Sequence, residues 1–247
     1  MDNIKQLIKK FIPRSILLLR RNYVQKKWEK YFKDKKTVQI FEEIYNHNLW
    51  SSNKTKKFDS GLGSHEAEVV DKYVESINKY FANKPKLDAV DLGCGDFNVG
   101  KKIRNLFNTY TACDIVSELI ERNKKEYNNC NVDFKRLDFS VDEIPKGDVL
   151  FVRQVLQHLD NQTIHKFIDN LNRATFKYLV LTEHIPAKRF ISNIDKPIGF
   201  GIRLGREGKK SGVVITDPPF NFRPKKEETL CEVNQMGGII RTILYYS

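Results

Sequence analysis

A glycine-rich turn between an apolar run and a helix-like stretch constrains this chain more than any other feature. Residues 91–97 read Asp-Leu-Gly-Cys-Gly-Asp-Phe, directly after the apolar run 87–90 and directly before the helix-like stretch 99–107. Glycines at 93 and 95 let the backbone turn sharply and let a ligand approach the main chain where a Cβ would collide. The following helix presents free N–H groups. The pattern therefore predicts a strand, a turn and a helix that bind a nucleoside.

The residues around this turn favour one kind of nucleoside over another. A dinucleotide fingerprint requires a third glycine at position 98, where this chain has asparagine. Asp91, at the expected strand end, can accept hydrogen bonds from a cationic amine, a contact that a phosphate ligand would not make. These features weaken the dinucleotide interpretation and favour a nucleoside with an amino group.

The turn resembles motif I of the class I S-adenosylmethionine-dependent methyltransferases. In that motif an acidic residue opens the pattern, and the loop passes the methionine part of the cofactor. The resemblance implies that S-adenosyl-L-methionine is the cofactor and that S-adenosyl-L-homocysteine is the product. Its implied contacts in the motif are Asp91, Gly93, Cys94 and Gly95.

The rest of the chain is consistent with the sheet of that family. Apolar and β-branched runs predict seven strands, at 87–92, 110–115, 132–136, 148–152, 178–182, 229–233 and 239–246. The last two flank Met236-Gly237-Gly238 and predict an antiparallel β-hairpin, which dinucleotide folds lack. We therefore expect an α/β fold with a Rossmann-like seven-stranded methyltransferase sheet, a C-terminal hairpin and an N-terminal helical extension. The methyltransferase domain itself is expected over residues 87–247.

Further cofactor contacts are expected at the ends of the next strands. Asp114 ends the second strand, where an acidic side chain can accept both ribose hydroxyls, and Ile115 follows it. Asp138 and Phe139 resemble the family's adenine pocket, although Asp138 could instead cap a loop. Arg153, after the fourth strand, completes the expected cofactor set.

Methyl transfer is an in-line displacement, and a hydroxyl acceptor must lose a proton as the bond forms. His158 leaves the fourth strand at the edge where ligands bind in open α/β sheets, and its imidazole can accept a proton near neutrality. We expect it to be the general base. The alternative is a histidine that only shapes the pocket at a helix start, and His184 occupies a similar position after the fifth strand.

Residues 185–226 are interpreted as a long insertion on the acceptor side. Polar groups within it could orient an acceptor, although each taken singly fits an ordinary loop residue better. The basic stretch 203–210 suggests an anionic acceptor, and the Asp-Pro-Pro-Phe run at 217–220 lies too late in the chain for an amino-methyltransferase motif. The expected acceptor contacts are Tyr45, Trp50, Gln154, His184, Asn193 and Arg203.

Residues 37–86 are expected to form a helical cap and a lid over the cofactor. Aromatic residues bracket the loop 60–64, which could close and exclude water, and Ser64 is the expected N-cap of a helix over 66–81. This arrangement resembles bacterial methyltransferases of surface-polysaccharide (capsule) synthesis. The resemblance implies O-methylation of a sugar, a nucleotide-linked or capsule precursor, or a phosphoramidate group.

Basic charge is concentrated in residues 1–36, which hold 12 Lys or Arg against 3 Asp or Glu and so carry +9 of the net +12. Pro13 separates two expected amphipathic helices, and Leu17, Val24, Trp28 and Tyr31 form an apolar stripe on the second. This leader could bind an anionic membrane surface, bind nucleic acid, or pack on its own domain as a cap. We expect a cytoplasmic protein at the inner face of the membrane. A nucleic-acid methyltransferase and a degenerate cofactor-binding module are the alternatives.

Cysteine and metal-ligand patterns are weak. The cysteines at 94, 113, 130 and 231 form neither a CxxC pair nor a Cys/His cluster, and no His/Asp/Glu group has convincing ligand spacing. We therefore expect reduced thiols and a reaction that needs no metal.

Overall fold

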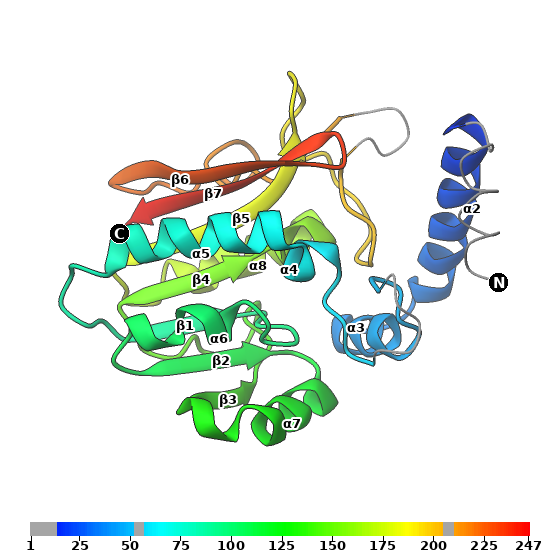
Figure 1. Ribbon diagram of the computed structural model, residues 1–247. Coiled ribbons are helices and arrows are strands. Elements are labelled where there is room, and N and C mark those ends of the chain that lie inside the picture. Colours follow the sequence, from blue (N-terminus) through cyan, green and yellow to red (C-terminus); the bar gives the residue numbers. More distant parts are fainter. Residues whose placement is uncertain (1–13, 52–56, 205–209) are drawn as a thin grey trace.

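The computed structural model describes residues 14–51, 57–204 and 210–247, with side chains from Tyr23 onward. A seven-stranded sheet forms its centre, with helices on both sides (Figure 1). The strands are β1 (Ala89–Leu92), β2 (Tyr110–Asp114), β3 (Asp133–Arg136), β4 (Val149–Arg153), β5 (Tyr178–Pro186), β6 (Lys226–Gln235) and β7 (Gly238–Tyr246). The helices are α2 (Arg14–Phe32), α3 (Thr37–Asn46), α4 (Leu62–His65), α5 (Ala67–Phe81), α6 (Gly100–Ile103), α7 (Ser117–Glu126) and α8 (Asn161–Leu171).

The strand order is β3-β2-β1-β4-β5-β7-β6. Strands β1 to β5 pair in parallel, whereas β7 runs antiparallel to both β5 and β6. The expected seven-stranded sheet with a C-terminal antiparallel hairpin is therefore confirmed. The hairpin strands and β5 extend beyond the expected limits, because β7 pairs with β5 along its whole length, from Tyr178 to Pro186.

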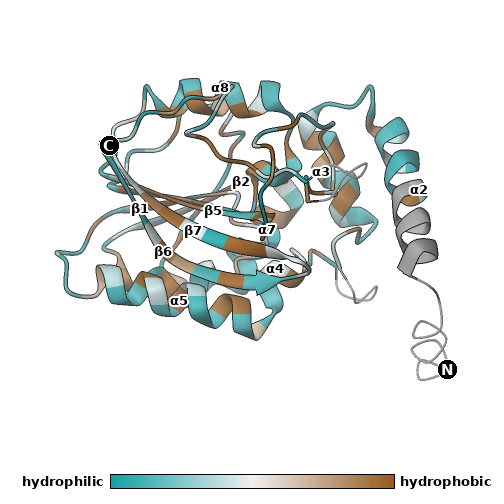
Figure 2. Ribbon diagram, turned by 90° about the horizontal axis from the view of Figure 1, so that it is seen from above, coloured by the Kyte–Doolittle hydropathy of each residue, from teal (hydrophilic) through white to brown (hydrophobic). Residues whose placement is uncertain are grey.

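Alternate residues of the strands pack on opposite faces of the sheet, as the two-residue period of a strand requires. Val149 and Phe151 of β4 join a cluster with α5, whereas Leu150 and Val152 join a cluster with α8. Figure 2 shows α5 and α8 on opposite sides of the sheet. Such a core explains why residues 149–152 of β4 and 178–181 of β5 are continuously apolar.

Helix α5 begins one residue after its expected start, but its N-cap differs from the expectation. The N-cap is Glu66, which makes no side-chain capping bond, whereas Ser64 lies inside the short helix α4. The Ser64 prediction was wrong because Ser64 belongs to a separate four-residue helix that ends just before α5 begins. The expected helix 99–107 is a short α6 followed by a 3₁₀ turn at 104–106.

The described part of α2 packs on its own chain. The Trp28 ring lies 5.4 Å from Phe32 and 5.0 Å from His47, and Gln25 lies against Gly201. Val24 and Tyr31 are 39% and 49% exposed, so the expected apolar stripe is packed at Trp28 but not at these two residues. Residues 1–13, the expected first leader helix, lie outside the described residues. No helix in the described ranges is long and apolar enough to cross a bilayer.

We expect Ile77→Ala to lower the free energy of unfolding by about 2–5 kcal/mol, because Ile77 is fully buried between α5 and the sheet. Lys79→Ala, on the exposed side of the same helix, should change it by less than about 0.5 kcal/mol. Urea unfolding followed by circular dichroism measures both values. Equal losses in the two variants would show that α5 does not pack on the sheet as described.

Candidate active site

A cavity of about 370 Å³ lies at the carboxyl edge of the sheet, where the strand order reverses between β1 and β4. Ligands of open α/β sheets bind at this reversal, and the volume falls in the range of small-molecule sites. Most of the residues predicted from the sequence line it. They are Tyr45, Trp50, Asp91, Gly93, Cys94, Gly95, Asp114, Ile115, Asp138, Phe139, Arg153, Gln154, His158 and His184.

Two glycines bring the cavity walls close to the backbone. Gly93 has φ +82°, and a Cβ there would lie 2.5 Å from Val155 on the turn after β4. Gly95 has φ +56°, and a Cβ there would lie 2.4 Å from the Ser60 hydroxyl. Both positions combine a left-handed backbone with a neighbour that leaves no space, so only glycine fits. This is the physical basis of the glycine motif in this chain.

Asp91 is a buried carboxylate in the floor of the cavity. Its Oδ2 accepts a hydrogen bond of 3.1 Å from the Tyr110 hydroxyl. Burial raises the pKa of Asp91 to about 7, although Tyr110 and the Arg153 guanidinium oppose the rise. The carboxyl group is therefore only partly ionised near neutral pH, and a cationic ligand would favour its ionised form.

Asp114 holds the loops at the end of β2. Its Oδ2 accepts the Gly95 N–H at 3.1 Å and its Oδ1 accepts the Val116 N–H at 3.1 Å. Burial raises the pKa of Asp114 to about 6, and these backbone donors limit the rise. Cys94 lies beside it, and burial raises its thiol pKa well above the usual value, so the thiol stays protonated.

The expected adenine-side residues also line the cavity. Phe139 packs against Phe167 of α8 with ring centroids 4.9 Å apart, which fixes its ring in the wall. Asp138 Oδ1 accepts bonds from the N–H and the hydroxyl of Ser140, at 3.0 and 2.7 Å. Asp138 thus caps the loop after β3, the alternative that the sequence left open, while remaining in the cavity wall.

Arg153 ties β4 to the segment 58–65, which we call the lid. Its Nη2 donates to the Gly63 carbonyl at 2.6 Å, and its guanidinium lies 4.9 Å from the centre of the Tyr73 ring. Its Nε is buried and has no hydrogen-bond partner among the described residues. The Gln154 side chain fills the space beside Gly63, where a Cβ would lie 1.9 Å from its Oε1.

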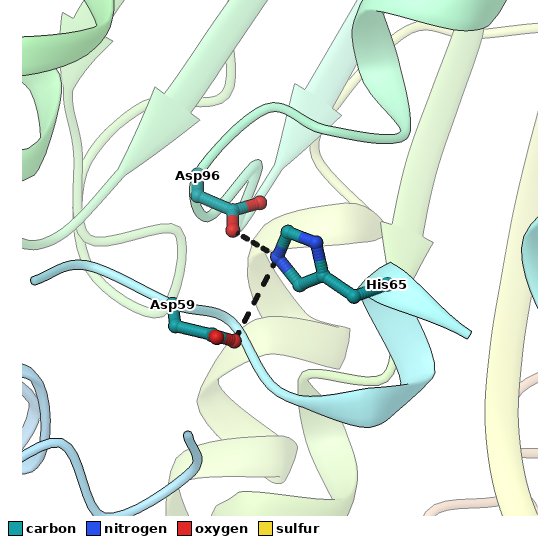
Figure 3. Close-up of side chains that lie close together, drawn as sticks. All are labelled: Asp59, His65 and Asp96. Carbon is teal, nitrogen blue, oxygen red and sulfur yellow. Dashed lines mark hydrogen bonds and ion pairs between the residues drawn. The ribbon is translucent and has the colours of Figure 1, made fainter. Parts of the chain in front are cut away.

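A carboxylate–imidazole–carboxylate cluster joins the lid to the glycine turn, and Figure 3 shows both contacts converging on one ring nitrogen. His65 Nε2 lies 2.5 Å from Asp96 Oδ2 and 3.7 Å from Asp59 Oδ1. The Asp96 N–H also donates to the Ser60 hydroxyl at 2.8 Å, and the Tyr45 hydroxyl lies 3.1 Å from the same oxygen. The lid is therefore bonded to the loop that a cofactor would touch.

Sequence reasoning missed this cluster. Asp59, His65 and Asp96 have donor atoms of the type that binds divalent cations, all within 4.8 Å of one another. The hydrogen bond between His65 and Asp96 accounts for their close approach without an ion. One member of the cluster, Asp96, lies inside the glycine motif and could have been considered as a site residue. Asp59 and His65 are more than 30 residues away in the chain, so the sequence does not show that the three lie together.

The turn after β4 presents the acceptor-side residues. Gln154 has φ +57°, unusual for a residue with a side chain, which marks local strain beside the cavity. The His158 ring lies 4.9 Å from the Trp50 ring, and its Nδ1 is buried without a hydrogen-bond partner among the described residues. Burial lowers the pKa of His158 to about 3, and the Lys196 ammonium lowers it further. The imidazole is therefore neutral at physiological pH.

Two acceptor-side expectations need correction. Arg203 and Asn193 are buried outside the cavity and bond to the backbone, Arg203 at 2.8 Å to the Leu159 carbonyl and Asn193 at 2.8 Å to the Val214 carbonyl. Both were expected to contact an acceptor, but the insertion folds inward and uses them for its own structure. His184 lines the cavity as part of β5, not beyond it, and its Nε2 lies 2.9 Å from the Gln235 carbonyl oxygen.

Comparisons with known proteins agree with this geometry. Residues 90–175 match the family model of a methyltransferase domain. The structure resembles the N-methyltransferase NodS from Bradyrhizobium japonicum, solved with S-adenosyl-L-homocysteine, with a TM-score of 0.58, 12% identity and 85% and 98% of the two chains covered. It also resembles magnesium protoporphyrin IX methyltransferase from Synechocystis, solved with S-adenosylmethionine, with a TM-score of 0.56, 13% identity and 86% and 98% covered. The fold is that of the class I S-adenosylmethionine-dependent methyltransferases.

Two curated relatives extend the comparison. Ubiquinone biosynthesis O-methyltransferases from Rickettsia canadensis and Rickettsia felis are 27% and 28% identical over 142 and 141 residues. Each alignment covers 56% of this chain, and the chain spans 57% and 55% of the two relatives. Both curated relatives are named as enzymes of ubiquinone biosynthesis, so they do not support the sugar or capsule acceptor expected from the sequence.

We expect Gly93→Ala to destabilise the protein more than Gly237→Ala. Both glycines have positive φ, +82° and +78°, but a Cβ at 237 meets nothing within 4 Å, whereas one at 93 collides with Val155. Gly237→Ala should lower the free energy of unfolding by about 1–2 kcal/mol through backbone strain. Gly93→Ala should lower it by the same strain and, in addition, by the steric collision with Val155. Thermal and urea unfolding of the two variants measure the difference. Equal losses would mean that the β1 and β4 turns are not in contact.

Proposed function

We propose that this protein is an S-adenosylmethionine-dependent methyltransferase that acts on a hydroxyl group of a small, ring-shaped molecule. The observation that carries the proposal is a single cavity that joins the glycine turn after β1 to the turn after β4. One end of it is lined by carboxylates and glycines, and the other by aromatic rings and amides. The first end suits a cationic nucleoside and the second an acceptor that must be held in line with it.

The charges that line the cavity fit the cofactor. Within the described chain, Asp91, Asp96, Asp114 and Asp138 line it, against one arginine, Arg153. S-adenosylmethionine supplies a methyl group on a positively charged sulfur and also carries an ammonium group. Buried carboxylates with raised pKa values favour such a cation, and they disfavour a dinucleotide, which would bring phosphates. Glycines at 93 and 95 leave the backbone open to it.

The acceptor end favours a flat ring. Trp50 lies 5.2 Å from Tyr45, 6.0 Å from Phe41 and 4.9 Å from His158 between ring centroids. Its indole N–H donates to the Phe200 carbonyl at 3.3 Å, which fixes the ring in place. Aromatic walls stack on flat rings, and the amides of Gln154 and Gln157 can orient a hydroxyl on such a ring.

We propose His158 as the residue that accepts the acceptor's proton. Its neutral imidazole can accept a hydrogen bond from the hydroxyl and hold an oxygen lone pair toward the methyl group. The hydroxyl becomes far more acidic as the new bond to oxygen forms, so a weak base is sufficient to remove its proton. A base with a pKa of about 3 is therefore compatible with this role.

The finer acceptor assignments remain predictions. A sugar, nucleotide-linked or capsule precursor, or a phosphoramidate, follows from the expected polysaccharide resemblance, and a quinone-type ring follows from the printed names of the relatives. A ring that carries a hydroxyl group is common to a sugar and to a hydroxylated quinone-type ring. Membrane or nucleic-acid binding through residues 1–36 also stays a prediction. The described end of α2 packs on residues 196–201 of its own chain.

We expect the affinity for S-adenosylmethionine to rise roughly tenfold between pH 5.5 and pH 7. Asp91, with a pKa of about 7, gains charge over this range, and only its ionised form attracts the ligand's ammonium group. Asp91→Asn should bind weakly and with a much flatter pH dependence. Isothermal titration calorimetry of both proteins measures this. No heat of binding in the wild type at any pH would overturn the proposed function.

We expect His158→Gln to reduce turnover by about 10²- to 10⁴-fold while leaving cofactor affinity within threefold. His165→Gln, on α8 and in contact with Phe220, is the matched control and should keep full activity. Transfer of labelled methyl groups to a panel of catechols, free sugars and nucleotide sugars supplies the assay. Because the pKa of His158 lies near 3, its titration should not appear in the turnover profile between pH 5 and 8. Wild-type turnover in His158→Gln would exclude it as the base.

A further inference from the structure

We propose that Arg203, Lys196 and Glu183 are positioning residues that hold the turn 156–159, and with it His158 and Gln157, in the cavity wall. The expected effect on turnover rests on the proposed function. The expected effect on the position of the turn does not. Two of the three residues come from the insertion at 185–226, which the sequence had assigned to direct acceptor contact.

Arg203 binds the carbonyl side of the turn. It is only 2% exposed, and its Nη1 and Nη2 donate to the carbonyls of Leu156 and Leu159 at 3.2 and 2.8 Å. Two further bonds, to the Ile194 carbonyl and to Asn161 Oδ1, both at 3.0 Å, anchor it to the insertion and to the start of α8. One planar guanidinium thus connects the two ends of the turn with a geometry that a lysine cannot reproduce.

Lys196 and the backbone of the insertion hold the residue at the centre of the proposal. The Lys196 ammonium donates to the His158 carbonyl at 3.0 Å, and the Gly199 N–H donates to the same oxygen at 3.0 Å. Lys196 is 4% exposed, although its side chain carries a charge. The backbone of His158 is therefore fixed from the insertion side, and its ring is left against Trp50.

Glu183 binds the opposite, N–H side of the turn. Its Oε1 accepts the Leu156 N–H at 3.1 Å, and its Oε2 is buried without a hydrogen-bond partner among the described residues. The adjacent strand residue contributes as well, because the His184 N–H donates to Gln157 Oε1 at 3.1 Å. Burial raises the pKa of Glu183 to about 8, so this carboxyl group is largely protonated at neutral pH.

Three buried ionisable groups around four residues have a large desolvation cost. Such a cost is retained where the groups add bonds to an irregular backbone segment. The turn 156–159 is a single 3₁₀ turn, in which the Leu159 N–H donates to the Leu156 carbonyl at 3.0 Å. The contacts bind the turn from both sides and do not reach the cavity. Their consequence is to set where the imidazole of His158 and the amide of Gln157 lie.

The experiment compares two buried arginines that both donate hydrogen bonds to backbone carbonyls, one beside the cavity wall and one away from it. Arg104 is 6% exposed and donates to the carbonyls of Cys130, Asn131, Phe107 and Asn108, away from the cavity. Arg203→Lys and Arg104→Lys therefore remove similar bonds. We expect both to lower the melting temperature, but only Arg203→Lys should lower kcat, on the order of 10- to 100-fold, with cofactor affinity within threefold.

A readout without activity uses Trp50. In a Trp28→Phe background Trp50 is the only tryptophan, and its contact with the His158 ring reports the position of the turn. We expect Arg203→Lys to increase acrylamide quenching of Trp50, and Arg104→Lys to leave it unchanged. Lys196→Met replaces Arg203→Lys if the latter does not fold, because the Gly199 N–H still satisfies the His158 carbonyl.

Glu183 supplies a conservative rescue. Glu183→Gln keeps an oxygen for the Leu156 N–H and should retain turnover within threefold, whereas Glu183→Leu should lose it to the same extent as Arg203→Lys. Unchanged Trp50 quenching and kcat in folded Arg203→Lys and Lys196→Met would overturn the inference. Failure of the wild type to bind S-adenosylmethionine would instead overturn the proposed function, and the Trp50 measurements would still decide the inference.

Discussion

The close approach of two backbone turns at the centre of the sheet is the constraint on which the rest of the site depends. Gly93, after β1, and Val155, after β4, are so near that a Cβ on the glycine would lie 2.5 Å from a valine methyl. This contact occurs at the point where the strand order reverses, so the loops on either side diverge and leave a cavity. The glycines are therefore required by packing between β1 and β4 as much as by the ligand.

Charge is organised in two ways around this cavity. Carboxylates line the end near the glycine turn, and burial raises the pKa values of Asp91 and Asp114 to about 7 and 6. Behind the opposite end, Arg203, Lys196 and Glu183 are buried and serve the backbone of one turn. The first arrangement favours a cationic ligand, whereas the second fixes the residues that would face the acceptor. Arg203, the first residue of the basic stretch 203–210, therefore gives no evidence for an anionic acceptor.

The lid connects the N-terminal region to the glycine turn through a small polar network. His65 lies between Asp59 and Asp96, Ser60 bonds with Tyr45 and Asp96, and Arg153 holds the Gly63 carbonyl. The contacts from the lid to Asp96 and Arg153 join residues at least 30 positions apart in the chain. The contacts of His65 with Asp59 and of Ser60 with Tyr45 are shorter in range. A lid was expected from the glycines and aromatics near residue 60, but its bonding partners were not.

The sequence by itself determined the fold class, the seven strands, the terminal hairpin and the residues of the glycine turn that line the cavity. These features depend on local signals, because strand periodicity, glycine turns and acidic residues at strand ends act over a few neighbouring positions. Helix α5 was found for the same reason, to within one residue.

Only the tertiary structure decided the roles of Asn193, Arg203, His65 and Asp96. A long insertion carries no periodic pattern, so its direction of folding cannot be read from its residues, and Arg203 was taken for a ligand contact when it packs inward. Polar side chains form bonds with whatever the fold brings within about 3 Å, and that proximity is a property of the folded chain. The cavity wall near the glycine turn could therefore be predicted from the sequence, whereas the folding of the insertion depended on long-range packing.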